Sequence, residues 1–399
     1  MVDQTSTIPK GWKITTLGAV AEKIVDNRGK TPPITTSGFE LLEVNTISES
    51  QRTPDYSRVT KYINEDTFKH WFRTGVILEN DILIPTVGTI GNVSFSKVSR
   101  GAIAQNLIAV RTDAKKSEPL FVYYFLKNPS SKNKLLNLDI GGVQPSIKVP
   151  HLLAVEIETP PLPEQRAIAA VLSSLDDKIE LLREQNKTLE ATAQAIFKEW
   201  FVDFNFPGAT GKMIDSELGQ IPAGWTVGTV NDVITRHTIT YRCDADDLSK
   251  IGKTPIIDQG SNGLYGYTER EPDFEASTEN PVIIFTNHTC NMWFINYPFC
   301  AIQNVIPFRG NAEYSSFFVY YMTLGRVTFI EYKGHWPDFE QKEYAIPTPN
   351  LANIFAEIVK PLQHKIWNNN SQIQNLSTLR DTLLPKLMKG EVRVAGFND

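Results

Sequence analysis

Two Gly-Lys-Thr-Pro strings, at 29–32 and 252–255, are the first residues in this 399-residue chain whose types could do chemistry. Gly-Lys-Thr is the core of a loop that binds nucleoside triphosphates, but that loop also needs a glycine five positions before its second glycine. Ile24 and Asp247 stand at those two positions. We therefore expect neither string to bind ATP, because the backbone could not fold around a triphosphate in the usual way.

Two further strings imitate catalytic motifs. Asn-Tyr-Pro-Phe at 296–299 is similar to the Asn-Pro-Pro-Phe motif of amino-methyltransferases, but Tyr297 replaces the first proline and no glycine-rich cofactor loop lies upstream. Asp338, Glu340 and Lys342 resemble the set that shares Mg²⁺ in nucleases, yet that chemistry needs groups on neighbouring strands. No catalytic constellation remains, so we expect a chain that is not itself an enzyme.

Metal and membrane chemistry are also disfavoured by the spacing of residues. Cys243, Cys290 and Cys300 form no Cys-x-x-Cys pair and the six His are scattered, so we expect no metal. No apolar run approaches the roughly 18 residues of a membrane span, and residues 1–10 hold no apolar signal core. We expect a cytoplasmic chain with reduced thiols and no membrane partner.

The charge is unevenly distributed. The whole chain carries 40 Lys and Arg against 45 Asp and Glu, a net charge of −5 that argues weakly against a nucleic-acid binder. Residues 1–160 hold 19 basic and 16 acidic residues, whereas residues 207–350 hold 10 and 17. The acidity sits mainly in one block, so the total does not exclude nucleic acid as a partner.

The elements that would position any site are duplicated. Ile-Pro-Lys-Gly-Trp at 8–12 recurs as Ile-Pro-Ala-Gly-Trp at 221–225, and later echoes follow in the same order. They are Gln-Asn-Leu-Ile at 105–108 against Gln-Asn-Val-Ile at 303–306, and Phe-Val-Tyr-Tyr at 121–124 and again at 318–321. Each half of the chain is therefore predicted to be a globular module followed by a helix.

Short apolar runs between Gly and Pro punctuation predict α+β modules of mixed strands and helices. We expect strands at 75–78, 82–85, 103–110 and 282–285, and short helices at 121–126 and 317–324. The expected organisation is module 1 (1–158), a central long helix (159–206), module 2 (207–349), a C-terminal long helix (350–390) and a tail (391–399).

Both long helices carry a heptad seam, which is typical of a coiled coil. Antiparallel pairing would place Asn186 opposite Asn369, whereas parallel pairing would leave the Asn186 amide facing Ile373. We therefore predict an antiparallel, pseudo-twofold pair, although Asn on a wet edge remains an alternative. Arg380 fits the seam poorly, and Pro361 should delay or kink the second helix. The seam residues are Leu172, Leu175, Ile179, Leu182, Asn186, Leu189, Ile196, Val359, Leu362, Ile366, Asn369, Ile373, Leu376 and Leu383.

At this point the chain resembles the specificity subunits of type I restriction-modification systems, a family with two target-recognition domains separated by two long helices. The resemblance rests on five stretches in family order, at 8–12, 84–92, 161–168, 197–204 and 383–394. The second half departs from the pattern in one place. Gly-Val-Gln-Pro-Ser-Ile at 142–147 survives only as Gly-His-Trp-Pro at 334–337, so the equivalence of these two loops is open.

The resemblance implies a non-catalytic role in phage defence. Each module would read one half of a bipartite, asymmetric double-stranded DNA target, and the helical stalk would set the spacing and dock two adenine-methylating modification subunits. No cofactor is expected on this chain, because S-adenosylmethionine belongs to the modification subunits. Motor-nuclease restriction subunits would join the complex only in a system that also cleaves DNA.

We place the DNA contacts on loops, since loops vary while a scaffold positions them. The Gly-Lys-Thr-Pro turns suit phosphate contact through Arg28, Lys30, Thr31, Lys253 and Thr254. A tight loop could bring backbone N–H groups to DNA at Thr86, Gly88, Thr89, Gly91 and Asn92, with Gln144 and Lys148 on a later loop. Polar and aromatic tips in module 2 are Ser261, Asn262, Tyr265, Tyr267, Asn287, His288 and Thr289.

The repeated amide pairs allow more than one interpretation. Gln105, Asn106, Gln303 and Asn304 could bond adenine in bidentate fashion, hold phosphates, or merely cap a core strand. Aromatic residues at 197–206 could anchor the first long helix to a module or form part of a dock for modification subunits. For the whole chain, the alternatives are a coiled-coil scaffold that reads no DNA and the specificity subunit of a methylation-only system.

Overall fold

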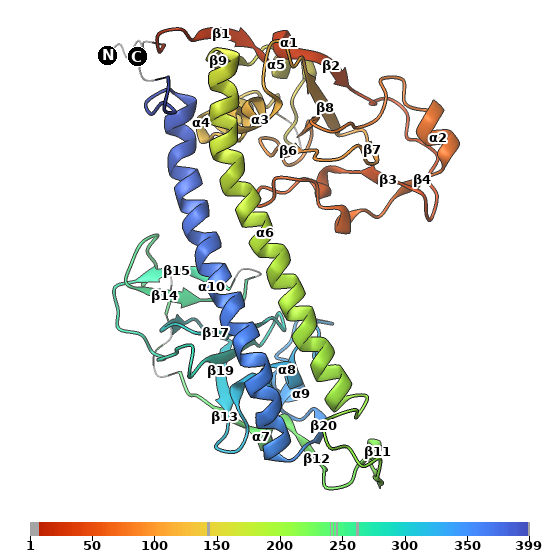
Figure 1. The fold of residues 1–399 in the computed structure, drawn as a ribbon, viewed down its shortest axis with the longest axis vertical. Coiled ribbons are helices and arrows are strands. Elements are labelled where there is room, and N and C mark those ends of the chain that lie inside the picture. Colours follow the sequence, from red (N-terminus) through yellow and green to blue (C-terminus); the bar gives the residue numbers. More distant parts are fainter. Residues whose placement is uncertain are drawn as a thin grey trace. The chain divides into compact units, whose positions relative to one another are not determined.

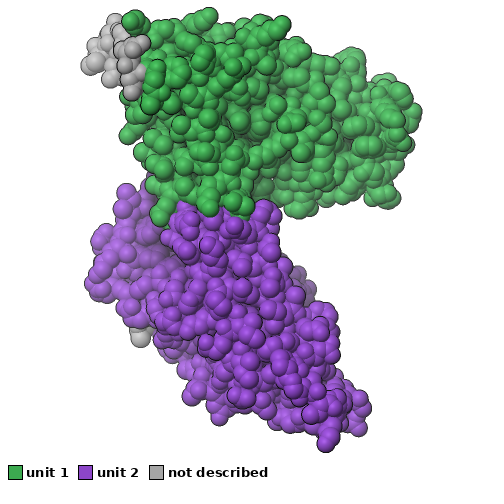
Figure 2. Space-filling model, in the orientation of Figure 1, with its two compact units in different colours: residues 1–181, 373–399 green, residues 182–372 purple. Residues whose placement is uncertain are grey.

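The computed structural model describes residues 8–141, 144–239, 241, 243–244, 246–260 and 263–397. It divides into two compact units, unit 1 from residues 1–181 and 373–399 and unit 2 from residues 182–372 (Figure 2). Each unit thus combines one module with half of each long helix. Among the described residues, no helix has both the length and the apolar character needed to cross a membrane.

Module 1 is built on three small sheets (Figure 1). One is four-stranded and antiparallel in the order β2-β8-β5-β6, one has the order β4-β3-β7 with β3 and β7 parallel, and one is the pair β1-β9. The strands are β1 Lys13–Thr16, β2 Ala21–Val25, β3 Phe39–Leu42, β4 Tyr62–Ile63, β5 Ile82–Pro85, β6 Ser94–Phe95, β7 Ala102–Ile103, β8 Leu107–Thr112 and β9 Glu156–Thr159. The helices are α1 Leu17–Val20, α2 Glu65–His70, α3 Pro119–Lys127, α4 Pro129–Leu136 and α5 Val149–Leu153, with short 3₁₀ turns at Val44–Thr46 and Tyr56–Arg58.

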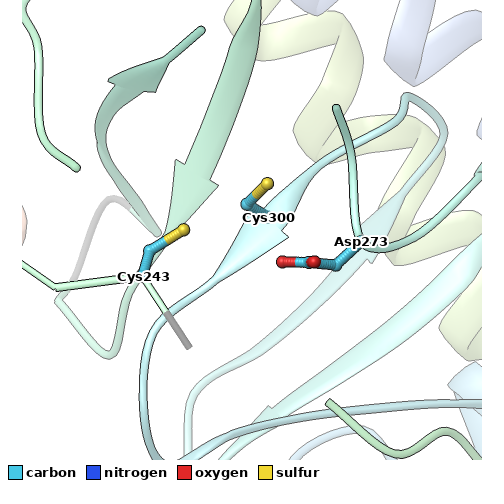
Figure 3. A group of neighbouring side chains, drawn as sticks. All are labelled: Cys243, Asp273 and Cys300. Atoms are coloured by element: carbon cyan, nitrogen blue, oxygen red, sulfur yellow. The ribbon is translucent and has the colours of Figure 1, made fainter. Parts of the chain in front are cut away.

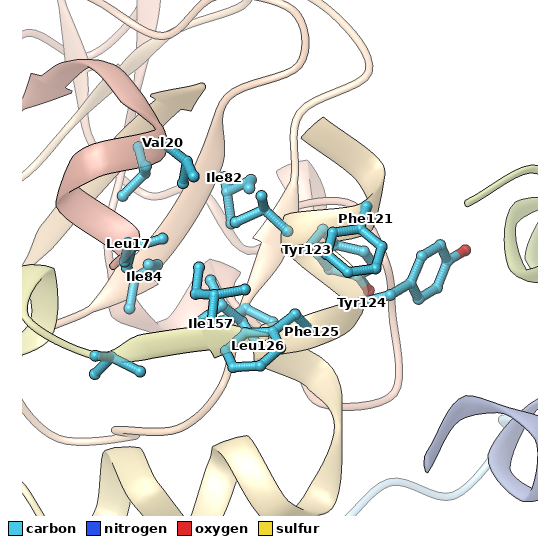
Figure 4. Packing of buried hydrophobic residues seen from close by; sticks show 14 of the residues in the cluster. Leu17, Val20, Ile82, Ile84, Phe121, Tyr123, Tyr124, Phe125, Leu126 and Ile157 are labelled. Atoms are coloured by element: carbon cyan, nitrogen blue, oxygen red, sulfur yellow. The ribbon is translucent and has the colours of Figure 1, made fainter. Parts of the chain in front are cut away.

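Strand β5 shows why this sheet is covered on both faces. All four of its residues are buried, and side chains alternate between faces along a strand. Ile82 and Ile84 pack with Leu17 and the aromatic helix α3, as seen in Figure 4, whereas Leu83 packs with Leu42 against the three-stranded sheet. The first module therefore has two apolar layers that hold its loops in place.

Module 2 repeats this topology, which confirms the internal repeat. Its sheets have the orders β13-β19-β16-β17, β15-β14-β18 with β14 and β18 parallel, and β12-β20, and a hairpin β10-β11 precedes them. The strands are β10 Met213–Ser216, β11 Gly219–Pro222, β12 Thr226–Thr229, β13 Ile234–Arg236, β14 Thr254–Ile257, β15 Leu264–Thr268, β16 Val282–Thr286, β17 Met292–Ile295, β18 Cys300–Ala301, β19 Val305–Gly310 and β20 Glu343–Ile346. The helices are α7 Val230–Val233, α8 Ser316–Thr323 and α9 Trp336–Glu340.

The two long helices, α6 Leu162–Phe201 and α10 Pro349–Met388, pack antiparallel in both units. Asp176 contacts Arg380 in unit 1, and Asn186 contacts Asn369 in unit 2. Residues with higher numbers on α6 therefore contact residues with lower numbers on α10, as in an antiparallel pair. The Asn369 Nδ2 donates to the Asn186 Oδ1 at 2.8 Å, which confirms the predicted register. All fourteen predicted seam residues are buried or half-buried.

Three local expectations were wrong. Residues 75–78 form no strand, because Ile77 is buried without a partner strand while the Leu78 N–H donates to Asp81. The predicted strand 103–110 is interrupted by a turn at 104–106 that separates β7 from β8. Helix α10 begins at Pro349 and continues through the exposed Pro361, so this proline does not delay the start of the helix.

The aromatic residues at the end of α6 anchor the helix to module 2. The Phe201 ring packs against Trp225, Phe318 and Phe355, with ring centroids 5.1–5.8 Å apart. Phe204 and Phe206 contact the same Trp225 ring. The anchoring interpretation of this segment is therefore confirmed.

Candidate functional site

Three loops that the sequence singled out in module 1 meet in space. The Gln105 Nε2 donates to the Thr31 Oγ1 at 3.1 Å, which joins the amide pair to the first Gly-Lys-Thr-Pro turn. The Thr86 N–H donates to the Asn106 carbonyl at 2.9 Å, and the Gly88 N–H donates to the Pro145 carbonyl at 2.9 Å. The loop before Lys148 is therefore tied to the same neighbourhood, where Thr31, Asn106, Thr89, Gln144 and Lys148 are all exposed.

The amide pair of module 1 lies on the surface. Thr31, Gln105 and Asn106 line a pocket of about 360 Å³. Gln105 is half-buried and Asn106 is exposed, both in the turn between β7 and β8. These amides therefore have room for an external partner.

A basic and aromatic pocket of about 400 Å³ lies beside the first turn, lined among others by Arg28, Lys30, His70, Trp71 and Arg73. The Arg28 guanidinium donates to the Asp26 carboxylate, which lowers the pKa of Asp26 and offsets part of the positive charge. Lys30 is exposed and forms no ion pair within the described residues. Sequence reasoning missed the last three of these five residues, although the interleaved basic and aromatic run at 68–73 was a usable signal.

The glycine loop is set by its backbone. Gly88 and Gly91 have φ of +84° and +87°, the left-handed region that glycine adopts most readily. Gly91 is also buried, and a Cβ there would lie 3.1 Å from the Lys132 side chain, which leaves little room for a larger residue. Asn92 is half-buried. Within this loop, Gly88 and Thr89 are the predicted residues that face solvent.

Two predicted contacts need correction because the side chains are buried. The Thr86 side chain is inaccessible, with the residue 1% exposed, and its N–H already bonds Asn106. Thr254 is 3% exposed, and its hydroxyl donates to the Arg270 carbonyl at 2.6 Å. Both threonines are therefore parts of the scaffold, whereas Thr31 is exposed.

Module 2 repeats the loop contacts of module 1. The Asn287 N–H donates to the Asn304 carbonyl at 2.9 Å, as that of Thr86 does to Asn106. The His335 N–H donates to the Asn287 carbonyl at 2.8 Å, as that of Ile147 does to Thr86. The sequence did not decide whether the loops at 142–147 and 334–337 are equivalent. These matched hydrogen bonds show that they are.

The loop before His335 carries an exposed apolar tip that sequence reasoning missed. Ile330 and Tyr332 are 83% and 82% exposed, and Phe329 is 54% exposed. The Tyr332 ring stacks on His288 with centroids 4.8 Å apart, and the His288 Nδ1 bonds the Lys333 carbonyl. The tip is thus joined to predicted site residues. The available signal was the group of large side chains Phe329, Ile330 and Tyr332 between Gly325 and Gly334.

The other predicted residues of module 2 differ in their exposure and in their hydrogen-bond or ion-pair partners. The exposed Lys253 pairs with Glu271 at 2.5 Å. The Thr289 hydroxyl donates to the Gln259 carbonyl, and the Asn304 backbone has φ of +66°. Tyr265 and Gln303 are exposed and Tyr267 is half-buried. Ser261 and Asn262 lie outside the described residues.

Each module is attached to the long helices through its repeated Phe-Val-Tyr-Tyr helix. In unit 1, the Tyr124 hydroxyl donates to Asp176 of α6 at 2.7 Å, and that carboxylate also binds Arg380 of α10. In unit 2, the equivalent Tyr321 hydroxyl bonds Gln363 of α10 at 3.2 Å. Burial raises the pKa of both tyrosines, so they stay protonated and can donate. Arg380, which fitted the apolar seam poorly, is therefore explained by its buried carboxylate partner.

Module 1 has a second attachment to α6. The Arg52 side chain is 3% exposed and binds the carboxylates of Asp177 and Glu180. Lys97 binds the same two carboxylates at 2.9 and 2.6 Å. The orientation of module 1 on its half of the helix pair is thus set by charged contacts as well as by packing.

Comparisons with known proteins agree on one family. Residues 9–191 match the family described as "Type I restriction modification DNA specificity domain". The chain is 30% identical to the HindI specificity subunit of Haemophilus influenzae over 69% of this chain and 77% of that protein. It is 26% identical to the MjaIX specificity subunit of Methanocaldococcus jannaschii over 97% and 95% of the two chains. The fold matches an S subunit structure from M. genitalium with a TM-score of 0.61, at 18% identity over 97% of this chain and 98% of that chain.

Proposed function

The chain belongs to the specificity subunits of type I restriction-modification systems, and we propose that its two modules each read one half of a bipartite, asymmetric DNA target. The observation that carries this proposal is the repetition of the same loop contacts in both modules. The Thr86 and Asn287 positions make equivalent backbone hydrogen bonds, yet their side chains differ. A shared scaffold with different tips suits two half-sites of different sequence.

The residues that would contact DNA fall into two classes. In module 1, Lys30, Arg28 and Arg73 surround one pocket and suit phosphate, whereas Gln105 and Asn106 have the amide groups that read adenine. In module 2, the tip with Ile330 and Tyr332 is apolar and exposed, which suits stacking on bases or contact with a thymine methyl group. Positioning and reading would therefore be divided between different side chains.

The charge of module 2 limits what the chain does alone. Lys253 pairs with Glu271 and Lys333 pairs with Asp338, so part of its positive charge is already neutralised. Because neutralisation of phosphates usually dominates DNA affinity, the modification subunits would supply most of the cationic contacts. The chain alone should bind DNA weakly, and tight binding with a steep salt dependence would contradict this division.

The remaining parts of the proposal concern partners. The chain would act without catalysis in the cytoplasm, dock two adenine-methylating subunits on its helices and set the half-site spacing by stalk length. S-adenosylmethionine would bind to those subunits, because their reaction requires the methyl donor. The same arrangement serves a methylation-only system and one with restriction subunits.

The test is to co-express the chain with its modification subunit in a methylation-free host and map methylated adenines across the genome. We expect a split asymmetric motif with one methylated adenine in each half. Exchanging residues 1–158 for those of a related subunit should change one half of the motif only. If the complex forms but adds no methylation and binds no DNA, the scaffold alternative is favoured instead.

A further inference from the structure

Three side chains of module 2 that are far apart in the sequence lie close together in Figure 3. They are Cys243, Asp273 and Cys300, and one sulfur or carboxylate oxygen from each lies within 4.8 Å of the others. None of them belongs to the loops described above. Sequence spacing indicated no metal site, because local motifs cannot report residues that only the fold brings together.

The backbone holds the three residues at fixed positions. Cys300 begins β18, which pairs with β14, and the Cys243 N–H donates to the Ala301 carbonyl at 3.2 Å. Phe274, next to Asp273, exchanges two backbone hydrogen bonds of 3.1 Å with Phe299, next to Cys300. All three segments are therefore bonded to one stretch of chain, which gives a preorganised cluster.

The cluster is buried and contains a polar atom without a partner. Cys300 is 0% exposed and Cys243 is 4% exposed. The Asp273 side chain is 8% exposed, and its Oδ2 has no hydrogen-bond partner among the described residues. A buried carboxylate oxygen in that condition is unfavourable unless a cation or a donor occupies the space beside it.

We propose that Cys243, Asp273 and Cys300 bind a zinc ion, with water as the fourth ligand. Zinc prefers thiolate sulfur and carboxylate oxygen in a tetrahedral arrangement. Sulfur atoms about 2.3 Å from the ion stand about 3.8 Å apart in that geometry, so the observed separations need shifts below about 1 Å. The Asp273 Oδ2, which has no hydrogen-bond partner among the described residues, would be the carboxylate ligand of this ion.

Arg270 balances the charge of this site. Its Nη1 donates to the Cys243 Sγ at 3.2 Å, and its Nη2 lies 3.6 Å from the Asp273 Oδ1. Two thiolates and one carboxylate around a divalent ion leave one negative charge, which the guanidinium neutralises from the outer shell. Each thiol would release its proton to solvent when the ion binds, because the thiolate and not the thiol is the ligand.

The ion would act as a structural clamp. It would join β18 to the segment that contains Arg270 and Asp273 and to the segment that contains Cys243. The same three-stranded sheet includes β15, which carries Tyr265 and Tyr267. Zinc would therefore stabilise the surface that presents these predicted reading residues.

Cobalt titration of the full chain tests the site. The protein, purified without a metal-binding tag and dialysed against a chelator, is titrated with Co²⁺, because thiolate ligands give an intense sulfur-to-cobalt absorption band. We expect saturation at about one Co²⁺ per chain, displacement by added Zn²⁺ and a higher melting temperature with Zn²⁺. Elemental analysis after incubation with ZnCl₂ should likewise give about one zinc per chain.

The third cysteine provides a matched control. Cys290 lies outside the cluster, so Cys290→Ser should retain the band, whereas Cys243→Ser and Cys300→Ser should lose it. Asp273→Asn keeps the shape of the side chain and should weaken Co²⁺ binding at least about tenfold, even if a cysteine variant fails to fold. Absence of a thiolate band in the folded wild type, or its loss in Cys290→Ser alone, would overturn the proposal.

Discussion

The two asparagines in the helix pair should respond unequally to the same substitution. Asn369 is fully buried, its Nδ2 donates to Asn186, and its Oδ1 has no partner among the described residues. Asn186 is half-buried, and its Nδ2 donates to the exposed Asn370 at 2.8 Å. Replacing each in turn by leucine therefore removes the same hydrogen bond but leaves a different group behind.

The change in the free energy of unfolding for each variant depends on which polar atoms stay buried without a partner. Asn186→Leu leaves both polar atoms of the Asn369 amide unpaired in the seam, which costs about 1–3 kcal/mol. Asn369→Leu loses one bond worth about 0.5–1.5 kcal/mol, but it removes the unpartnered oxygen and adds buried apolar surface worth about 1.5–3 kcal/mol. The second variant should be neutral or stabilising, and the double leucine variant should recover the stability lost by Asn186→Leu.

Urea unfolding followed by helical circular dichroism measures the difference. Asn368→Leu is the control, because Asn368 is exposed one residue earlier on α10 and should change the free energy of unfolding by less than about 0.5 kcal/mol. A greater loss of stability in Asn369→Leu than in Asn186→Leu would refute the reasoning. The double variant should also lose pairing specificity, since a single polar layer is what sets register in such seams.

The other predictions concern charged groups. Asp176→Ala breaks a buried ion pair and should cost unit 1 about 3–5 kcal/mol by calorimetry, whereas Asp381→Ala, which removes the exposed partner of the same arginine, should cost under about 1 kcal/mol; equal losses would contradict this. Lys30→Ala should lower the salt-dependence slope of DNA binding by the assembled methyltransferase by about one, and Lys116→Ala, beyond the opposite end of β8, should leave it unchanged. Burial alone would raise the pKa of Asp177, but hydrogen bonds from Arg52 and Lys97 lower it below its usual value. The ionised Asp177 therefore stabilises the folded chain above about pH 4, and this stabilisation is lost as the pH falls through the pKa of Asp177 in the folded state. Asp177→Asn should therefore flatten the acid side of the melting-temperature profile, and an unchanged profile would count against the pair.

The helix pair and the repeat were predictable from the sequence for a local reason. A heptad pattern can be recognised within the consecutive residues of one helix. The two asparagines then indicate the antiparallel direction and the register in which the helices pair. The Phe-Val-Tyr-Tyr echo likewise predicted two equivalent helices, which are α3 and α8. The failure at residues 75–78 arose because burial was satisfied there without strand pairing.

The candidate site was predictable only as a set of loops. Residue type and turn chemistry pointed to the neighbourhoods of Thr31, Gln105 and Gln144, but not to the bonds that join them. Nor could they show that Thr86 and Thr254 are buried while Trp71 and Tyr332 are exposed.

The periodicity of apolar residues shows which side of a helix or strand faces a core. It was therefore enough to predict the two modules, the helical stalk and the register of the stalk. It holds no information on which distant loops meet, because those contacts depend on how whole sheets pack. The matched hydrogen bonds of the two modules, the ion pairs of Arg52 and Arg380, and the grouping of Cys243, Asp273 and Cys300 all join residues from separate segments. Only the packed tertiary structure decides such neighbours.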